Sequence, residues 1–190
     1  MDAFGCDDQA IRKSATYDVE IASRASSQSD EDVFFALAVD DLSRTDRVDG
    51  WVSLEVSPLL AHDTEGTVAA ARHLHERARQ PNLFIKIPGT PEGLPAIERA
   101  IFAGLPVNVT LLFSDAQYVA ACDAYLRGVE RRIEAGLNPA VGSVASIFVS
   151  RWDVAVSGKV PAELANRLGL AVAQRTYKTL EDHVPNRKHC

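Results

Sequence analysis

The sequence predicts an α/β fold in which parallel strands alternate with helices. Two observations lead to this prediction. Four short runs rich in β-branched residues, at 51–57, 83–87, 106–113 and 143–149, are separated by segments with helical periodicity. Polar residues also lie inside these runs, close to their carboxyl ends. Strands separated by helices pair in parallel and are joined by right-handed crossovers.

The segments between the runs are predicted to be helices, because each has apolar residues at helical spacing and a start or stop signal. Residues 1–16 are expected to form a flexible arm, 17–182 the folded domain and 183–190 a tail. Helices are predicted at about 17–27, at 30–46 with Asp30 as N-cap, at 64–79 with Asp63 or Thr64 as cap, at 92–103, after Ser114 to about 135, from Arg151, and from Pro161 to about 182.

Composition narrows the class of protein. The 190 residues suit one domain, and a net charge of −6 argues against a nucleic-acid-binding face. Three cysteines without metal-ligand spacing indicate reduced thiols in a cytoplasmic protein, and no metal site is expected. No apolar run approaches the ~20 residues that span a bilayer, so we expect no membrane partner.

The polar residues inside the runs favour a barrel over a doubly wound sheet. A doubly wound sheet covers both faces with helices, so its strands are almost entirely apolar. In a barrel one face points inward, and residues near the carboxyl ends of the strands line the active site. The polar residues concerned are Glu55, Lys86, Asn108, Thr110 and Ser146.

Lys86 is the strongest chemical signal, because it lies between Ile85 and Ile87 near the end of a strand. Burial disfavours the ammonium form of an amine, and an amine nucleophile can attack a carbonyl to form a Schiff base. Glu55 in the preceding strand can point into the same cavity, where it would move protons. The alternative for the two residues is a structural ion pair that keeps the amine charged.

Two further pairs complete the predicted site. Asn108 and Thr110 are two residues apart and therefore share one strand face, where they can bind hydroxyl groups or simply satisfy strand-end polarity. Ser146 and Arg151 bracket the end of the fourth strand, and Arg151 opens a helix, so together they suit a sugar phosphate. The alternative for Arg151 is an ordinary surface arginine.

Taken together, these stretches resemble the transaldolases, class I aldolase-type enzymes, and in particular their longer bacterial branch. The resemblance covers residues 15–182, and the order and spacing of its motifs make it specific. The stretches that carry it are GWVSLEVSP (50–58), NLFIKIPGT (82–90), PEGL (91–94), VNVTLLFS (107–114) and SIFVSR (146–151).

The resemblance implies a (β/α)8 barrel that transfers a dihydroxyacetone unit from a ketose phosphate to an aldose phosphate in the pentose phosphate pathway. Lys86 would form the Schiff base and Glu55 would activate water, with Thr110 as a further catalytic residue. Asn108, Ser146 and Arg151 would bind substrate. No cofactor is expected, because the lysine imine itself accepts the electrons.

The match corresponds to strands three to six of such a barrel. The family's first-strand aspartate, its Ser-Asn-Pro motif and its last two strands have no counterpart in this sequence. Besides a transaldolase, the sequence therefore allows a simple class I aldolase with the same lysine. It also allows a non-catalytic fragment or interaction module.

A partial barrel of four strands is expected to self-associate or to bind a complementing chain. Its edges at 51–57 and 143–149 would carry unpaired backbone groups, and its open inner face would expose apolar surface. Light scattering on the purified chain should therefore show species larger than a monomer. A coupled ketose-transfer assay should show weak turnover or none. A stable monomer with full activity would contradict this expectation.

Overall fold

The computed structural model describes residues 44–45 and 49–183, and the chain divides after Val52 into two units. The predicted arm at 1–16 and the predicted helix at 17–27 lie outside the described residues, as does most of the helix predicted at 30–46. In the described part of the first unit, the Thr45 hydroxyl accepts a hydrogen bond of 2.9 Å from the Asp49 N–H.

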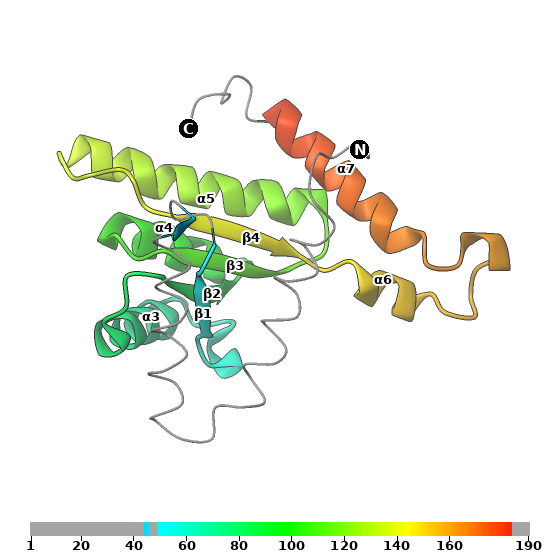
Figure 1. The fold of residues 1–190 in the computed structure, drawn as a ribbon, viewed down its shortest axis with the longest axis horizontal. Coiled ribbons are helices and arrows are strands. Elements are labelled where there is room, and N and C mark those ends of the chain that lie inside the picture. The colour runs from blue at the N-terminus through cyan, green and yellow to red at the C-terminus, as the bar shows by residue number, and fades with distance from the viewer. Residues whose placement is uncertain (1–43, 46–48, 184–190) are drawn as a thin grey trace. The chain divides into compact units, whose positions relative to one another are not determined.

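Four parallel strands form one sheet in the order β1-β2-β3-β4 (Figure 1). Each strand lies where the sequence predicts it. β1, β3 and β4 are shorter than predicted at one or both ends, whereas β2 extends one residue further, to Pro88. The chain leaves β1 early because Pro58 begins a 3-10 turn there. The strands are β1 Val52–Glu55, β2 Leu83–Pro88, β3 Val107–Leu112 and β4 Ser143–Ile147.

Three helices connect the strands and cover one face of the sheet (Figure 1). They are α3 Thr64–Ala78, α4 Gly93–Ala103 and α5 Asp115–Glu134, and each packs against the next. The strands follow chain order without the reversal that defines a doubly wound sheet. The predicted α/β fold of four parallel strands with flanking helices is therefore confirmed, and its winding is that of a partial (β/α)8 barrel.

Local side-chain bonds start two of these helices where the sequence predicts. The Asp63 carboxylate accepts a 2.9 Å bond from the Gly66 N–H at the start of α3. At α5 the Ser114 hydroxyl accepts from the Gln117 N–H, and the Gln117 side chain reaches back to the Phe113 N–H. Both arrangements satisfy backbone donors that a helix start leaves unpaired.

The prediction of one last helix from Pro161 is wrong. The structure has a short 3-10 helix, η2 Ala162–Leu164, followed by α7 Leu168–His183. Between them Ala165 is extended and Asn166 adopts a left-handed conformation with φ of 57°, so the helical hydrogen bonds cannot run through. The helix predicted from Arg151 is α6 Ser150–Ala155, which is six residues long.

The core lies between the sheet and α4. Apolar side chains of both elements are fully buried, and α5 approaches α4 closely at Gly128, where a Cβ would lie 2.8 Å from the Glu98 carbonyl oxygen. Only glycine fits at this crossing. The buried side chains include Leu83, Ile85, Ile87, Ile97, Ile101, Val107 and Val109.

β3 contains an irregularity at Leu111. This leucine has a φ of 58°, the left-handed region that costs an L-residue with a side chain roughly 1–2 kcal/mol. The register between β3 and β4 shifts at the same place, between Val109 and Leu112. The strand therefore keeps a locally unfavourable backbone, although its register with β2 runs from Val107 to Thr110 without a shift.

An ion-pair cluster joins α4 to α5 on the outer surface. The Glu98 carboxylate accepts 2.9 Å bonds from Arg127 and from Arg131, and Arg131 also lies over the Phe102 ring. Partial burial by itself would raise the pKa of Glu98, but the bonds and charges of the two arginines outweigh it and hold that pKa below its usual range.

Glu98→Gln should lower the free energy of unfolding at pH 7 by about 0.5–1 kcal/mol, the range for pairs whose arginines are largely exposed. A carboxylate with a lowered folded-state pKa stabilises the fold above its unfolded pKa of about 4.3, and loses that effect as pH falls through the folded value. Urea denaturation should therefore separate the two proteins at pH 7 and bring them together once the pH falls below the folded-state pKa of Glu98. Glu76→Gln, which removes an exposed carboxylate of α3, is the control. A difference that persisted in acid would contradict the ion-pair explanation.

Candidate functional site

The face of the sheet away from the helices carries the predicted site residues. Lys86 is paired with Asn108, Pro88 with Thr110, and Asn108 with Val144. Residues that pair across two parallel strands point to the same face of the sheet. Residues two apart along one strand also share a face. Ile85 and Ile87 on either side of the lysine are fully buried on the opposite face. Register alone therefore gathers the polar residues of three strands on one surface.

Asn108 is the centre of a hydrogen-bonded row across this surface. Its amide nitrogen donates to the Ser53 hydroxyl at 3.1 Å, and its amide oxygen accepts from the Ser146 hydroxyl at 2.9 Å. Ser53 lies on β1, so the bond crosses over β2. Neighbouring strands are about 4.8 Å apart, so such a bond requires a surface that curves inward, as the inside of a barrel does.

Lys86 and Glu55 are in direct contact. The lysine Nζ lies 2.7 Å from the Glu55 carboxylate, with 25% of the lysine side chain and 62% of the glutamate side chain exposed. The ion pair that the sequence left open as an alternative is thus formed. It also has the geometry for proton transfer, because general bases act across about 2.6–3.2 Å. Both side chains are partly open to solvent.

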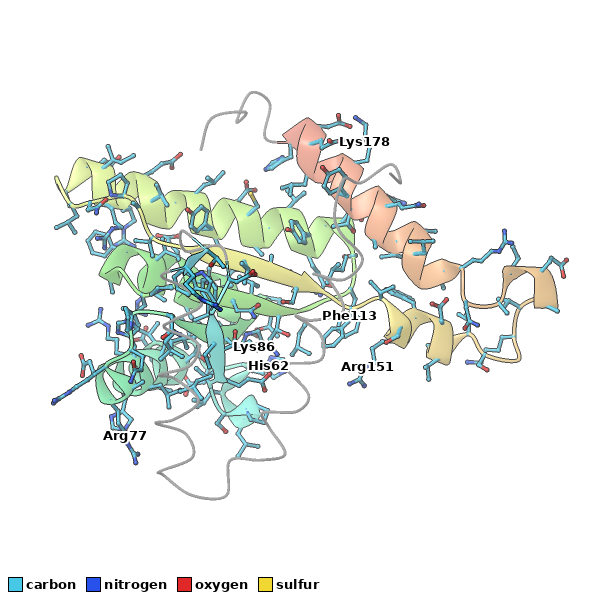
Figure 2. All side chains as sticks on the ribbon, in the orientation of Figure 1. His62, Arg77, Lys86, Phe113, Arg151 and Lys178 are labelled. Carbon is cyan, nitrogen blue, oxygen red and sulfur yellow. The ribbon has the colours of Figure 1, made fainter. Side chains whose placement is uncertain are left out.

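Arg151 is held at the end of β4 by aromatic rings. Its guanidinium lies 5.4 Å from the centroid of the Phe148 ring, which stacks on Phe113 at 5.0 Å. The Trp152 indole N–H donates to the Phe113 carbonyl at 2.9 Å. Figure 2 shows Arg151 at α6, beside Phe113. The arginine is exposed, so its charge is available to an anion while its side chain rests on an apolar support.

Two loops at the carboxyl end of the strands are tied together. The Thr64 hydroxyl donates to the Glu92 carbonyl and the Thr90 hydroxyl to the Ala61 carbonyl, both at 2.6 Å. His62 lies 3.2 Å from the Glu92 carboxylate. A bond from its own backbone N–H, followed by the one from His62, lowers the pKa of Glu92. These links join the loop after β1 to the loop after β2, next to Lys86.

The structure brings most of the predicted site residues together and adds others. Lys86, Glu55, Asn108 and Ser146 are connected in pairs by contacts, whereas Thr110 joins them only through its register with Pro88. Arg151 lies at the edge of the same surface, beyond β4.

Sequence reasoning missed three residues of this site. Ser53 could have been found, because it precedes Glu55 by two and so shares its face. Phe148 follows Ser146 by two in the run predicted as a strand, and its N–H still bonds to the Leu112 carbonyl although β4 ends at Ile147. Phe113 has no such signal, because its stacking on Phe148 depends on how two distant segments meet.

Residues 44–45 and 49–183 contain no group of three His, Cys, Asp or Glu side chains arranged to hold a metal ion. In the same part of the chain, no helix is long and apolar enough to cross a membrane.

Comparisons with known proteins match most of this chain. The family model described as transaldolase/fructose-6-phosphate aldolase matches residues 8–188. A transaldolase of Acidothermus cellulolyticus is 49% identical over 145 residues, which cover 73% of this chain and 39% of that protein. A transaldolase of Mycobacterium tuberculosis is 39% identical over 194 residues, which cover 92% of this chain and 52% of that protein.

The chain spans about half the length of these relatives or less. The range matched by the family model includes all four strands and every residue of the polar surface. The chain belongs to the transaldolase/fructose-6-phosphate aldolase family.

Proposed function

We propose that this chain supplies the Schiff-base centre of a transaldolase, which moves a dihydroxyacetone unit from a ketose phosphate to an aldose phosphate in the pentose phosphate pathway. The observation that carries the proposal is the 2.7 Å contact between Lys86 and Glu55 on the polar face of the sheet. The family match supports the reaction class. The transaldolase names belong to relatives about twice as long, so the substrates are inferred from them.

In the first step Glu55 takes a proton from the Lys86 ammonium across the 2.7 Å contact. The neutral amine attacks the ketose carbonyl, a carbon–nitrogen bond forms, and one proton moves from the attacking nitrogen to the carbonyl oxygen, which becomes a hydroxyl. Protonated Glu55 then returns its proton to that hydroxyl, which leaves as water and gives the protonated imine. The lysine–glutamate pair thus ends as a protonated imine beside a carboxylate.

In the second step the carbon–carbon bond next to the imine carbon breaks. Its electrons move to the imine nitrogen and form an enamine, while the departing aldose loses its hydroxyl proton to a base. An aldose phosphate then takes up the enamine carbon in the reverse sequence. In this proposal Asn108 and Thr110, which share one face of β3, bind the hydroxyl groups of the dihydroxyacetone unit during this exchange.

The substrate phosphate is assigned to Ser146 and Arg151. A hydroxyl and an exposed guanidinium at the end of one strand offer charge-assisted bonds to phosphate oxygens. Phe148 supports the arginine from one side, which limits the rotamers that it must lose on binding. The carbonyl end of the substrate would then react at Lys86 on β2, while its phosphate end would be bound at the end of β4.

The family description also covers an aldolase that acts on fructose 6-phosphate, and such an enzyme would use the same lysine. The two activities differ in the fate of the enamine. A transaldolase passes it to an acceptor aldose, whereas an aldolase protonates it. Release of free dihydroxyacetone without any acceptor aldose would therefore identify the aldolase.

The proposal is tested by trapping the imine. Borohydride reduction in the presence of fructose 6-phosphate should attach the sugar-derived unit to Lys86, and peptide mapping should find it there. Lys86→Arg keeps the charge beside Glu55 but cannot form the imine, so it should give no adduct. An adduct at Lys13, Lys159, Lys178 or Lys188 in place of Lys86 would overturn the assignment.

Glu55→Gln should slow formation and hydrolysis of the imine by roughly 10²–10⁴-fold, because a positioned proton donor and acceptor is lost. Binding of the ketose phosphate, measured by calorimetry, should remain close to that of the unmodified chain. Glu65→Gln is the control, since Glu65 is an exposed carboxylate paired with Arg99 between α3 and α4. An unchanged rate of adduct formation would mean that Glu55 only forms an ion pair with Lys86 and transfers no proton.

A further inference from the structure

The irregularity in β3 lies between two residues of the proposed site. The β3–β4 register runs through Val109 paired with Ala145 and resumes at Leu112 paired with Ile147. Three steps on β3 therefore match two steps on β4, and Thr110 and Leu111 together oppose Ser146. This two-against-one arrangement is a β-bulge, and bulges commonly redirect side chains next to active sites.

The bulge changes which face each leucine occupies. Uninterrupted alternation would place Leu112 on the polar face with Asn108 and Thr110. Instead Leu112 is fully buried, on the helix-covered face with Val109. A Cβ at Gly89 would lie 2.5 Å from Leu112 Cδ2 and 3.4 Å from Val109 Cγ1, which shows that these groups share one packed region. The bulge therefore keeps Thr110, and not a leucine, as the last paired residue of β3 on the polar face.

The backbone is fixed on both sides of the bulge. The Gly89 N–H donates to the Thr110 carbonyl at 2.7 Å, and the Phe148 N–H donates to the Leu112 carbonyl at 2.8 Å. Between these bonds Leu111 has a φ of 58° and is 39% exposed. A leucine disfavours this conformation, so its surroundings impose it.

We propose that Leu111 is a positioning residue, whose left-handed backbone closes the bulge and thereby sets the placement of Thr110 relative to Ser146. The inference rests on the proposed function, in which Thr110 serves the dihydroxyacetone unit and Ser146 the phosphate. A regular ladder would pair these two residues directly. The inserted residue breaks that pairing, so it controls how the reacting carbons lie once the phosphate is bound.

The test compares residues that differ in their tolerance of a left-handed backbone. Leu111→Asn tolerates this conformation and should keep the rate at which fructose 6-phosphate forms the borohydride-trapped Lys86 adduct. Leu111→Ile is equal in size but β-branched, and should lower that rate at saturating fructose 6-phosphate roughly 10- to 100-fold. Ile101→Val, a buried change in α4, is the control for lost stability and should leave the rate unchanged. If Leu111→Ile does not fold, Leu111→Val, which is smaller and also β-branched, takes its place, with a loss in the same direction expected.

A second readout does not require catalysis. The γ-methyl NMR signal of Thr110, assigned by its loss in Thr110→Ser, should stay in place in Leu111→Asn and Ile101→Val and move in Leu111→Ile. Equal rates and equal methyl shifts in Leu111→Ile and Ile101→Val would overturn the inference, as would equal losses in Leu111→Asn and Leu111→Ile. If the unmodified chain forms no Lys86 adduct, the proposed function fails, and the methyl signals still decide whether Leu111 positions Thr110.

Discussion

The site depends on one physical constraint, the burial of a single face of the sheet against α3, α4 and α5. Ile85, Ile87, Val107 and Val109 are withdrawn from water on that face, and the strand period of two then sends their neighbours to the other side. A register slip by one residue would expose these apolar side chains and bury Lys86. The hydrophobic core therefore specifies where the amine points, although it does not touch it.

Polar contacts refine what the core has placed. Asn108 on β3 bonds to hydroxyls on β1 and β4. It therefore connects its own strand both to the adjacent strand β4 and to β1, which lies beyond β2. A buried amide with both ends satisfied is rigid, because rotating it would break two bonds within a low-dielectric surface. Glu55 and Arg151 lie at more exposed positions, where side chains can move when a substrate enters. The site thus combines a fixed centre with adaptable edges.

Much of this fold could be predicted from local signals. Asp63 and Ser114 indicate where their helices begin, because a cap is a bond between residues three apart. The alternation around Lys86 indicates a strand with two different faces.

The break before the last helix could not be predicted, because Asn166 is a weaker sign of a helix break than a proline or glycine would be. The bulge at Leu111 could not be predicted for another reason. It is a property of the register between β3 and β4, and the sequence of one strand does not show which residues of the other strand it will pair with. The support of Arg151 by Phe148 and Phe113 likewise depends on two segments meeting in space.

The paired hydroxyl bonds between the loops after β1 and β2 have a mechanical consequence. Thr64 holds the Glu92 carbonyl and Thr90 holds the Ala61 carbonyl, so each loop is anchored in the other by a short side chain with little freedom. Neither loop can swing outward alone without leaving a hydroxyl and a carbonyl unbonded. The two loops consequently behave as one rigid unit. A bulky ligand that approaches Lys86 from this side has to displace both loops at once, or it has to enter from the side of β4.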